Sequence, residues 1–440
     1  MREWKKWNFL ASWQLASWLL AGCLLAGWTS TATAQEAPAQ PPEVVDVLLV
    51  GDSITDFWDN EGMPILKEYF GFRRYLNIGI SGDGTADTLV RLAQPRVANI
   101  APKTIMLMIG TNDIGWKKLS AETAIDGNRK ILETLRSRWP NAKILHLAVF
   151  PRGDKAEYQP KIDAINAAIK GMADNEHIFF LDINANFLDQ EGKTNKTLLP
   201  DLLHPNCAGY RLWAEAVEPT LSGWLGGIAV KPAERLNTEW WKSRFEKNKA
   251  DFKNQDTGLI LLGDSITHNW DRDAALYQKS FGAYQPANWG FSGDRTEHVL
   301  WRLDNIGDGK TAPKAIMLMI GTNNIGHDST TPDETIEGIH AILRRIEKKW
   351  PETRVLLLPV FPRGADTQDL RWQQVAQINA RMTSLADGKR VVFLDFNAKF
   401  LSPDGKMLPK EIMPDLLHPN TRGNEIWAES VAPALQELMK

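Results

Sequence analysis

The chain has 440 residues, which is too long for one ordinary hydrophobic core and favours two domains. Its apolar fraction of 43% and charged fraction of 24% are typical of globular proteins. The formal net charge is −3, so no strong positive field favours nucleic acid or an anionic membrane, and neither is expected as a partner.

The first 34 residues resemble an export signal peptide. A basic start precedes an apolar run over residues 15–28, and residues 32–34 form a small-x-small cleavage site. The apolar run is short and wrongly flanked for a transmembrane helix, so no integral membrane segment is expected in the mature chain. We therefore expect an exported protein, either periplasmic or secreted.

An alternative processing site lies inside the apolar run. Residues 20–23 resemble a bacterial lipoprotein box, and lipidation at Cys23 would anchor the chain. Against this, the apolar run continues past Cys23 to the ordinary cleavage site, and an uncleaved anchor is the third alternative. Cys207 is the other cysteine of the chain, so no internal disulfide forms if Cys23 leaves with the signal; we expect Cys207 to be a small buried residue at a helix start. Residues 35–43, rich in Ala, Pro and Gln, are predicted to be a disordered lead-in.

The remainder of the chain is an internal repeat. Four blocks recur at nearly constant spacing: 51–55 at 263–267, 105–112 at 316–323, 149–153 at 360–364, and 201–206 at 415–420. The period is far longer than that of solenoid repeats, so each copy is expected to fold independently. The predicted boundaries are 44–228 for the first domain, 229–256 for a linker with a leading helix, and 257–440 for the second domain.

Within the first copy, short apolar segments alternate with longer segments of helical character. The predicted strands are 44–50, 74–80, 104–109, 143–150 and 177–183, and the predicted helices include 121–139, 163–172 and 207–221. The strands are apolar almost throughout, which indicates burial on both faces of a parallel sheet. Five such strands alternating with helices predict a doubly wound α/β structure.

The segment between the copies is predicted to be an amphipathic helix over residues 237–254. It contains two adjacent tryptophans and many charges, and it leads into the first strand of the second copy at residues 259–262. An alternative interpretation is that this helix packs the two copies together.

Reactive side chains follow the strand ends of the first copy, where open α/β sheets bind their ligands. Ser53 follows the first strand and begins a helix. Gly82 follows the second strand, Asn112 the third, and the block 201–204 precedes the last helix. The four blocks are therefore expected to meet at one edge of the sheet.

These residue types suit ester hydrolysis. A serine hydroxyl is a poor nucleophile until a base accepts its proton, and His204 is the candidate base. Asp201, three residues earlier, can hold the far ring nitrogen and stabilise the imidazolium. The developing oxyanion needs donors, which the Ser53 N–H, the Gly82 N–H and the Asn112 side chain can supply.

The second copy repeats the set. Its candidate catalytic residues are Ser265, Asp415 and His418, and its candidate oxyanion-hole residues are Gly293 and Asn323. Each motif alone is weak, but four blocks in the same order, found twice, are specific. The eight histidines show no metal-ligand spacing, and no phosphate loop or dinucleotide fingerprint accompanies the strands, so no metal or cofactor is expected.

The blocks 51–53, 81–83, 110–113 and 201–204, with their second-copy partners, resemble those of the SGNH (GDSL-type) hydrolase family. The resemblance covers nearly the whole mature chain. It implies two tandem flavodoxin-like three-layer domains, each with a five-stranded parallel sheet. It also implies the Ser, Gly, Asn and His signature residues named above, an Asp three positions before the His, and metal-free hydrolysis of carboxylic esters.

More narrowly, residues 293–303 and 361–364 are similar to the acetylhydrolase branch typified by the catalytic subunits of intracellular platelet-activating-factor acetylhydrolase. That branch favours short acyl groups, chiefly acetyl. The first copy departs from the branch pattern over residues 84–92, where a His and a Trp are missing, so the substrates of the two copies can differ. By analogy with dimeric relatives, the two copies are expected to form an intramolecular pseudo-dimer.

The sequence thus predicts an exported serine esterase that cleaves short-chain, chiefly acetyl, esters through an acyl-enzyme. O-acetylated carbohydrate is the favoured substrate class, and phospholipid acetyl esters are the second choice. The alternatives are a longer-chain lipase or thioesterase, and one active copy beside a non-catalytic binding copy. A tandem carbohydrate-binding protein without catalysis is disfavoured, because both catalytic sets are complete.

Overall fold

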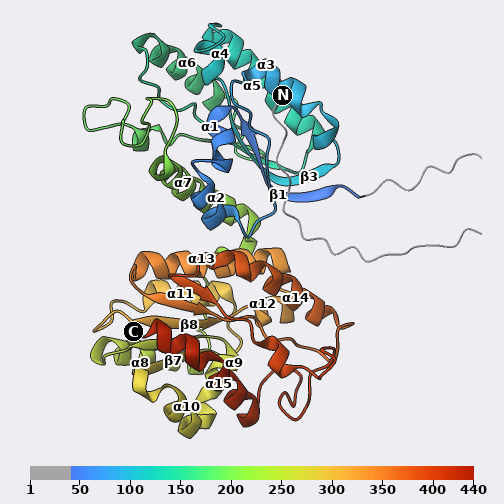
Figure 1. Cartoon of the computed structure of the whole chain (residues 1–440), viewed down its shortest axis with the longest axis vertical. Coiled ribbons are helices and arrows are strands. Elements are labelled where there is room, and N and C mark those ends of the chain that lie inside the picture. The colour runs from blue at the N-terminus through green and yellow to red at the C-terminus, as the bar shows by residue number, and fades with distance from the viewer. Residues whose placement is uncertain (1–40) are drawn as a thin grey trace, which may run out of the picture. The chain divides into compact units, whose positions relative to one another are not determined.

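The computed structural model describes residues 41–440 and contains two sheets of five parallel strands each (Figure 1). The strand orders are β2-β1-β3-β4-β5 and β10-β9-β8-β6-β7. The strands are β1 Glu43–Gly51, β2 Tyr75–Asn77, β3 Ile100–Met108, β4 Lys143–Leu147, β5 Ile178–Leu181, β6 Leu259–Gly263, β7 Pro286–Gly290, β8 Ala315–Met319, β9 Arg354–Leu357 and β10 Val391–Phe393. Both sheets have the same topology, and the predicted α/β fold class is confirmed.

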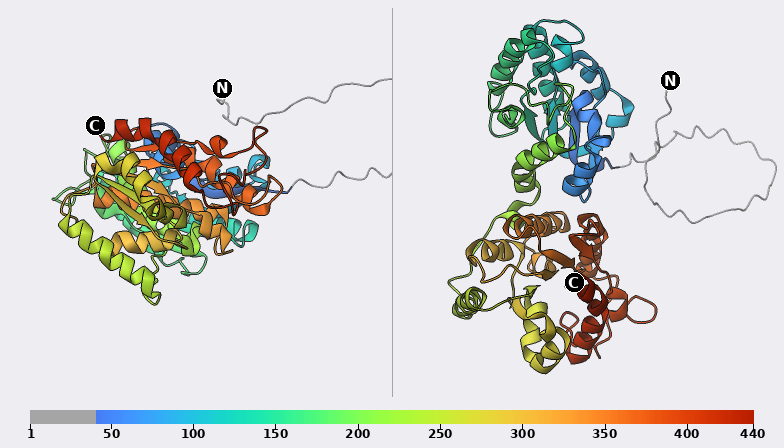
Figure 2. Two further views of the ribbon diagram at one scale, coloured as in Figure 1. Left: turned by 90° about the horizontal axis from the view of Figure 1, so that it is seen from below. Right: turned by 60° about the vertical axis from the view of Figure 1, so that its left-hand side comes forward.

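Helices pack on both faces of each sheet (Figures 1 and 2). The helices are α1 Ser53–Asp56, α2 Met63–Phe70, α3 Thr85–Leu92, α4 Thr111–Ile114, α5 Ala121–Arg138, α6 Gln159–Lys170, α7 Cys207–Leu225, α8 Glu239–Asn254, α9 Ser265–His268, α10 Ala274–Phe281, α11 Thr296–Asn305, α12 Thr322–Gly326, α13 Pro332–Lys349, α14 Leu370–Met382 and α15 Thr421–Leu438. Short 3-10 turns occupy several of the loops.

The side chains of β1 are divided between the hydrophobic clusters on the two faces of the first sheet. Val47 and Leu49 belong to the hydrophobic cluster under α2 and α7, whereas Leu48 and Val50 belong to the cluster under α3 and α5. Successive side chains of a strand point to opposite faces, so a sheet covered on both sides needs apolar residues at every position. Strand β1 thereby lies inside the sheet between β2 and β3, and its carboxyl end positions the first candidate site residue.

Some predicted boundaries were wrong. Strand β2 ends at Asn77 rather than continuing to residue 80, because the Asn77 side chain accepts the Gly79 N–H at 2.9 Å and donates to the Thr55 carbonyl at 2.9 Å, which turns the chain. Glu43, predicted to end a disordered lead-in, is the first residue of β1 and donates its N–H to the Asn99 carbonyl at 2.9 Å.

Cys207 begins α7 as predicted, but its side chain is exposed rather than buried. The predicted export signal, the Cys23 alternative and the lead-in up to residue 40 lie outside the described residues. Among residues 41–440, no helix is both long enough and apolar enough to span a membrane.

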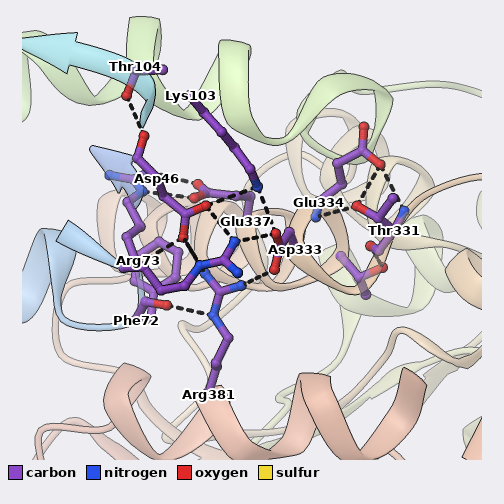
Figure 3. Close-up of polar contacts among 12 residues, drawn as sticks. Asp46, Phe72, Arg73, Lys103, Thr104, Thr331, Asp333, Glu334, Glu337 and Arg381 are labelled. Atoms are coloured by element: carbon purple, nitrogen blue, oxygen red, sulfur yellow. Dashed lines mark hydrogen bonds and ion pairs between the residues drawn. The ribbon is translucent and has the colours of Figure 1, made fainter. Parts of the chain in front are cut away.

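A buried arginine joins residues of the two copies (Figure 3). The Arg73 guanidinium donates to Glu337 of the second copy at 2.8 and 2.7 Å and to Glu218 of the first copy at 2.7 and 2.8 Å. Next to it, the side chain of Phe72 packs into the main hydrophobic cluster of the second copy. The contact between the two copies at Phe72 and Arg73 therefore combines a buried ion pair with apolar packing.

A second group of charges lies beside this arginine (Figure 3). Lys103 donates to Asp46 of the first copy at 2.9 Å and to Asp333 of the second copy at 2.7 Å. Arg381 donates to Asp333 at 2.5 Å and to the Phe72 carbonyl at 2.7 Å. Burial alone would raise the pKa of Asp46, but its hydrogen bonds to Arg74 and the nearby charge of Lys103 hold that pKa well below its usual range.

Candidate active site

The candidate nucleophile of each copy sits at a sharp turn between a strand and a short helix. A Cβ on Gly51 would lie 2.1 Å from Thr55 Oγ1 and 2.5 Å from the Met108 carbonyl oxygen, so the turn requires glycine. Asp52 then caps α1 by accepting the Ile54 N–H at 3.0 Å. Ser53 follows as the first helical residue and is 7% exposed. The second copy has the same cap at α9.

The six residues predicted to be catalytic form two hydrogen-bonded triads, one in each copy. In the first copy, Ser53 Oγ lies 2.8 Å from His204 Nε2, and His204 Nδ1 lies 2.6 Å from Asp201 Oδ2.

In the second copy, Ser265 Oγ lies 2.8 Å from His418 Nε2, and His418 Nδ1 lies 2.6 Å from Asp415 Oδ2. A nucleophile in hydrogen-bond reach of a base, whose far nitrogen faces a carboxylate, is the geometry that acyl transfer requires.

A short loop holds each histidine in place. Leu202 and Leu416 have positive φ angles of 64° and 59°, which turn the chain between the aspartate and the histidine. Asn206 then accepts the Gly209 N–H at 3.1 Å and caps the start of α7. In the first copy the ring of Phe57 packs 4.9 Å from the His204 ring, so an aromatic face covers one side of the imidazole.

Each predicted oxyanion asparagine is bonded to the residue that follows the predicted oxyanion glycine. Gly82 has a φ of +88° and Gly293 a φ of +78°, a backbone conformation that side chains disfavour. Asn112 donates one N–H of its side chain to the carbonyl of Asp83, the residue after Gly82, at 3.0 Å.

Asn323 makes the matching hydrogen bond to the Asp294 carbonyl at 3.0 Å. A carboxamide nitrogen carries two hydrogens, so one anchors the side chain and the other remains to face an oxyanion.

Burial changes the acidity of the aspartates around each serine. Asp52 and Asp264 are buried, and burial raises the pKa of each to about 7 against the lowering effect of the capping N–H. Burial would also raise the pKa values of Asp201 and Asp415, but hydrogen bonds from the histidine side chain and backbone lower both below the ordinary value. The aspartate that faces each histidine therefore remains ionised.

Several supporting residues were not predicted from the sequence. The Tyr210 hydroxyl donates to the Ile54 carbonyl at 2.7 Å and holds α1 against α7. Arg152 and Arg363 each donate to the first residue of the helix that carries the oxyanion asparagine. The recurrence of residues 149–153 at 360–364 was the one signal that pointed to the two arginines.

The histidine His146 lies away from these centres. His146 is buried in β4, bonded to Asn128 at 3.0 Å, and burial lowers its pKa to about 3, so it stays neutral.

Within residues 41–440, one group of side chains has metal-ligand spacing, with atoms of Glu218, Glu337 and His340 all within 4.8 Å of one another. Arg73 donates to both carboxylates of that group, which supplies positive charge without an ion.

Comparison with known proteins agrees with this geometry. The model of the GDSL-like lipase/acylhydrolase family matches residues 49–212 and 261–426. The human platelet-activating factor acetylhydrolase IB subunit alpha1 is 32% identical over 179 residues, which is 40% of this chain and 75% of the human protein. The alpha2 subunit from Gallus gallus is 32% identical over 179 residues, covering 40% and 76% of the two chains.

A solved structure from Streptococcus pneumonia, described as a putative platelet activating factor, shares 26% identity. It covers 42% of this chain and 86% of its own, with a TM-score of 0.35. The two matched regions of the family model fall on the two repeats and contain both serine–histidine pairs. The chain therefore belongs to the GDSL-like lipase/acylhydrolase family, in two tandem copies, and is a carboxylic ester hydrolase.

Proposed function

We propose that both copies hydrolyse short-chain, chiefly acetyl, carboxylic esters through an acyl-enzyme intermediate. One observation carries the proposal: each copy holds an unbroken serine–histidine–aspartate hydrogen-bonded chain with contacts of 2.8 and 2.6 Å. Because neither set lacks a member, the geometry favours two active centres over one active copy beside a binding copy.

In the proposed reaction, Ser53 Oγ attacks the ester carbonyl carbon while His204 Nε2 accepts the hydroxyl proton. Asp201 stabilises the imidazolium, and the N–H groups of Ser53, Gly82 and Asn112 bind the oxyanion. His204 then gives the proton to the departing alcohol, which leaves the acyl group on Ser53. Water attacks this ester with His204 again as the base, and the acid is released.

O-acetyl groups on carbohydrate are the substrate class we propose, and export from the cytoplasm is part of the same proposal. Its support is the export-like N-terminus and the relatedness to acetylhydrolases. An exposed tryptophan adds to it: Trp116 lies four residues after Asn112 in the chain and is 79% exposed, so it offers a flat apolar face in the loop that follows α4.

The test is acetate release by the purified chain from an O-acetylated xylo-oligosaccharide and from para-nitrophenyl esters of increasing acyl length. We expect acetate from both acetyl substrates and falling rates beyond butyryl, with the Ser53→Ala/Ser265→Ala double variant as the blank. A rate that rises with chain length, at about 0.8 kcal/mol per buried methylene, would instead indicate a long-chain lipase. No acetate from saturating acetylated sugar, with para-nitrophenyl acetate cleaved, would overturn the carbohydrate assignment.

We further propose that the two copies act as an intramolecular pseudo-dimer. The support is the buried Arg73, which bonds carboxylates of both copies, and Phe72, which packs into the second copy. Removal of the Arg73 charge tests this arrangement.

A further inference from the structure

The two centres differ in one side chain of the short helix that carries the nucleophile. Phe57 stands four residues after Ser53, and Asn269 stands four residues after Ser265. Each of the two caps the end of its helix and donates its backbone N–H to the carbonyl of the catalytic serine. The side chains of Phe57 and Asn269 therefore leave the backbone at equivalent positions.

The fold fixes the backbone at both positions. Trp58 and Trp270, the next residues along the chain, are both fully buried. In the first copy the Phe57 carbonyl also accepts two backbone N–H groups, at 3.0 and 2.9 Å, and the Phe57 side chain packs against the hydrophobic cluster under α2 and α7. The ring is therefore held in place before any substrate binds.

The Phe57 ring lies against the catalytic base of the first centre. Its centroid is 4.9 Å from that of the His204 imidazole, and the two planes are inclined by 31°. Neither ring is closed off from solvent, since Phe57 is half-buried and the His204 side chain is 24% exposed. At the equivalent position the second copy has the amide of Asn269, which offers no ring face.

The alcohol part of the ester leaves from beside this imidazole. His204 Nε2, which lies 2.8 Å from Ser53 Oγ, gives its proton to the departing alcohol oxygen. That oxygen must then lie within about 3 Å of Nε2, so the carbon atoms attached to it lie beside the Phe57 ring. A flat apolar ring next to the departing group favours alcohols that can place a ring against it.

The second centre has its exposed aromatic ring in a different place. Trp240 is 42% exposed and stacks on His268, with the ring centroids 5.9 Å apart. His268 Nδ1 lies 2.9 Å from Ser292 Oγ, and Ser292 directly precedes the oxyanion glycine Gly293. This ring therefore lies on the side of the oxyanion glycine, whereas Phe57 lies on the side of the base.

We propose that Phe57 is a specificity-determining residue of the first centre, which selects acetyl esters whose alcohol part contains a ring. The ring, either a sugar ring or another saturated ring, stacks on Phe57 while its exocyclic oxygen accepts the proton from His204. The second centre, with Asn269, has no such preference. The inference rests on the proposed esterase activity and names the alcohol class of one centre; the hydrolysis is unchanged, consumes one water and releases acetate and the free alcohol.

The test compares three acetates of secondary alcohols, which differ in the ring and little in the leaving group. They are isopropyl acetate, cyclohexyl acetate and a methyl xyloside acetylated at one hydroxyl and methylated at the others, so that the acetyl group cannot migrate. The Ser265→Ala chain isolates the first centre and the Ser53→Ala chain isolates the second. Acetate release gives kcat/KM for each ester.

We expect the ratio of kcat/KM for a ring ester to that for isopropyl acetate to be about fivefold higher at the first centre, a factor typical of one aromatic contact. The two ring esters show whether the sugar ring or the apolar ring is preferred. Exchange of the side chains gives the matched variants. Phe57→Asn should lower the ratio at the first centre to that of the second, Asn269→Phe should raise it at the second, and Phe57→Tyr, which keeps the ring, should preserve it.

A purely structural role of Phe57 would give a different result. If Phe57 only supported His204, Phe57→Asn would slow all three esters by the same factor and leave the ratio unchanged. That result, an unchanged ratio in Asn269→Phe, or equal ratios at the two centres would overturn this inference, while hydrolysis of isopropyl acetate would still uphold the proposed function. Failure to cleave any of the three esters would overturn the proposed function itself.

Discussion

His204 Nδ1 lies 2.6 Å from Asp201 Oδ2, and the other oxygen of the same carboxylate accepts the His204 backbone N–H at 2.7 Å. The aspartate thus fixes both the ring and the backbone of the histidine three residues later. His418 and Asp415 repeat the arrangement with contacts of 2.6 and 2.7 Å. A local turn, rather than a distant strand, orients each candidate base.

Asp201→Asn should therefore disable the first centre. In the Ser265→Ala chain, we expect kcat to fall by about 10⁴-fold, because an amide favours the wrong tautomer and cannot stabilise the imidazolium. The readout is steady-state hydrolysis of para-nitrophenyl acetate. Asp415→Asn in the same chain is the matched control and should change nothing, since that centre has no nucleophile. A loss below tenfold for Asp201→Asn would show that the aspartate is dispensable.

Asn112→Ala should lower the rate of the chemical step and not the binding of substrate. We expect a loss on the order of 10²–10³ in kcat, or about 2.7–4 kcal/mol of barrier, from the removal of one oxyanion donor. Measured in the Ser265→Ala chain, KM should change little, and Asn323→Ala serves as the control. A raised KM with an unchanged kcat would instead place Asn112 in ground-state binding.

Asp264 should make stability depend on pH. Its folded pKa is raised by burial to about 7 from an ordinary value of 3.8, so the folded state keeps a proton that the unfolded chain loses. The contribution of this group to the free energy of unfolding is full below about pH 4 and is lost as the pH rises through 7. Asp264→Asn keeps an oxygen to accept the Ile266 N–H but cannot titrate.

The stability of Asp264→Asn relative to the unmodified chain should therefore increase as the pH rises from 4 to 8. Urea unfolding at several pH values measures this difference. The exposed Asp126→Asn serves as a control, because it lacks the burial that raises the pKa of Asp264. Parallel curves for Asp264→Asn and the unmodified chain would contradict the assignment.

Arg73→Leu should be strongly destabilising, because it leaves Glu218 and Glu337 buried without their cation. Removal of one partner from a buried ion pair typically costs about 3–5 kcal/mol, which urea unfolding would detect. Addition of Glu337→Gln should recover part of the loss. Arg129→Leu removes an exposed pair with Asp126 and should cost under about 1 kcal/mol. Equal effects of Arg73→Leu and Arg129→Leu would argue against the proposed pseudo-dimer contact.

Much of this arrangement could be predicted from sequence because its determinants are local. The apolar run of β1 reports burial on both faces, and the three-residue spacing of Asp201 and His204 lies within one turn. The contact between Arg73 and Glu337 could not be predicted, since it joins residues 264 positions apart and leaves no periodic pattern.

The most direct test of two active centres is labelling with a serine-directed phosphonate, read by intact mass on the folded chain. The account predicts two adducts per chain, one adduct in each of Ser53→Ala and Ser265→Ala, and none in the double variant. One adduct per unmodified chain would contradict the claim of two centres and leave one copy non-catalytic. No adduct at all would contradict the assignment of Ser53 and Ser265 as activated nucleophiles.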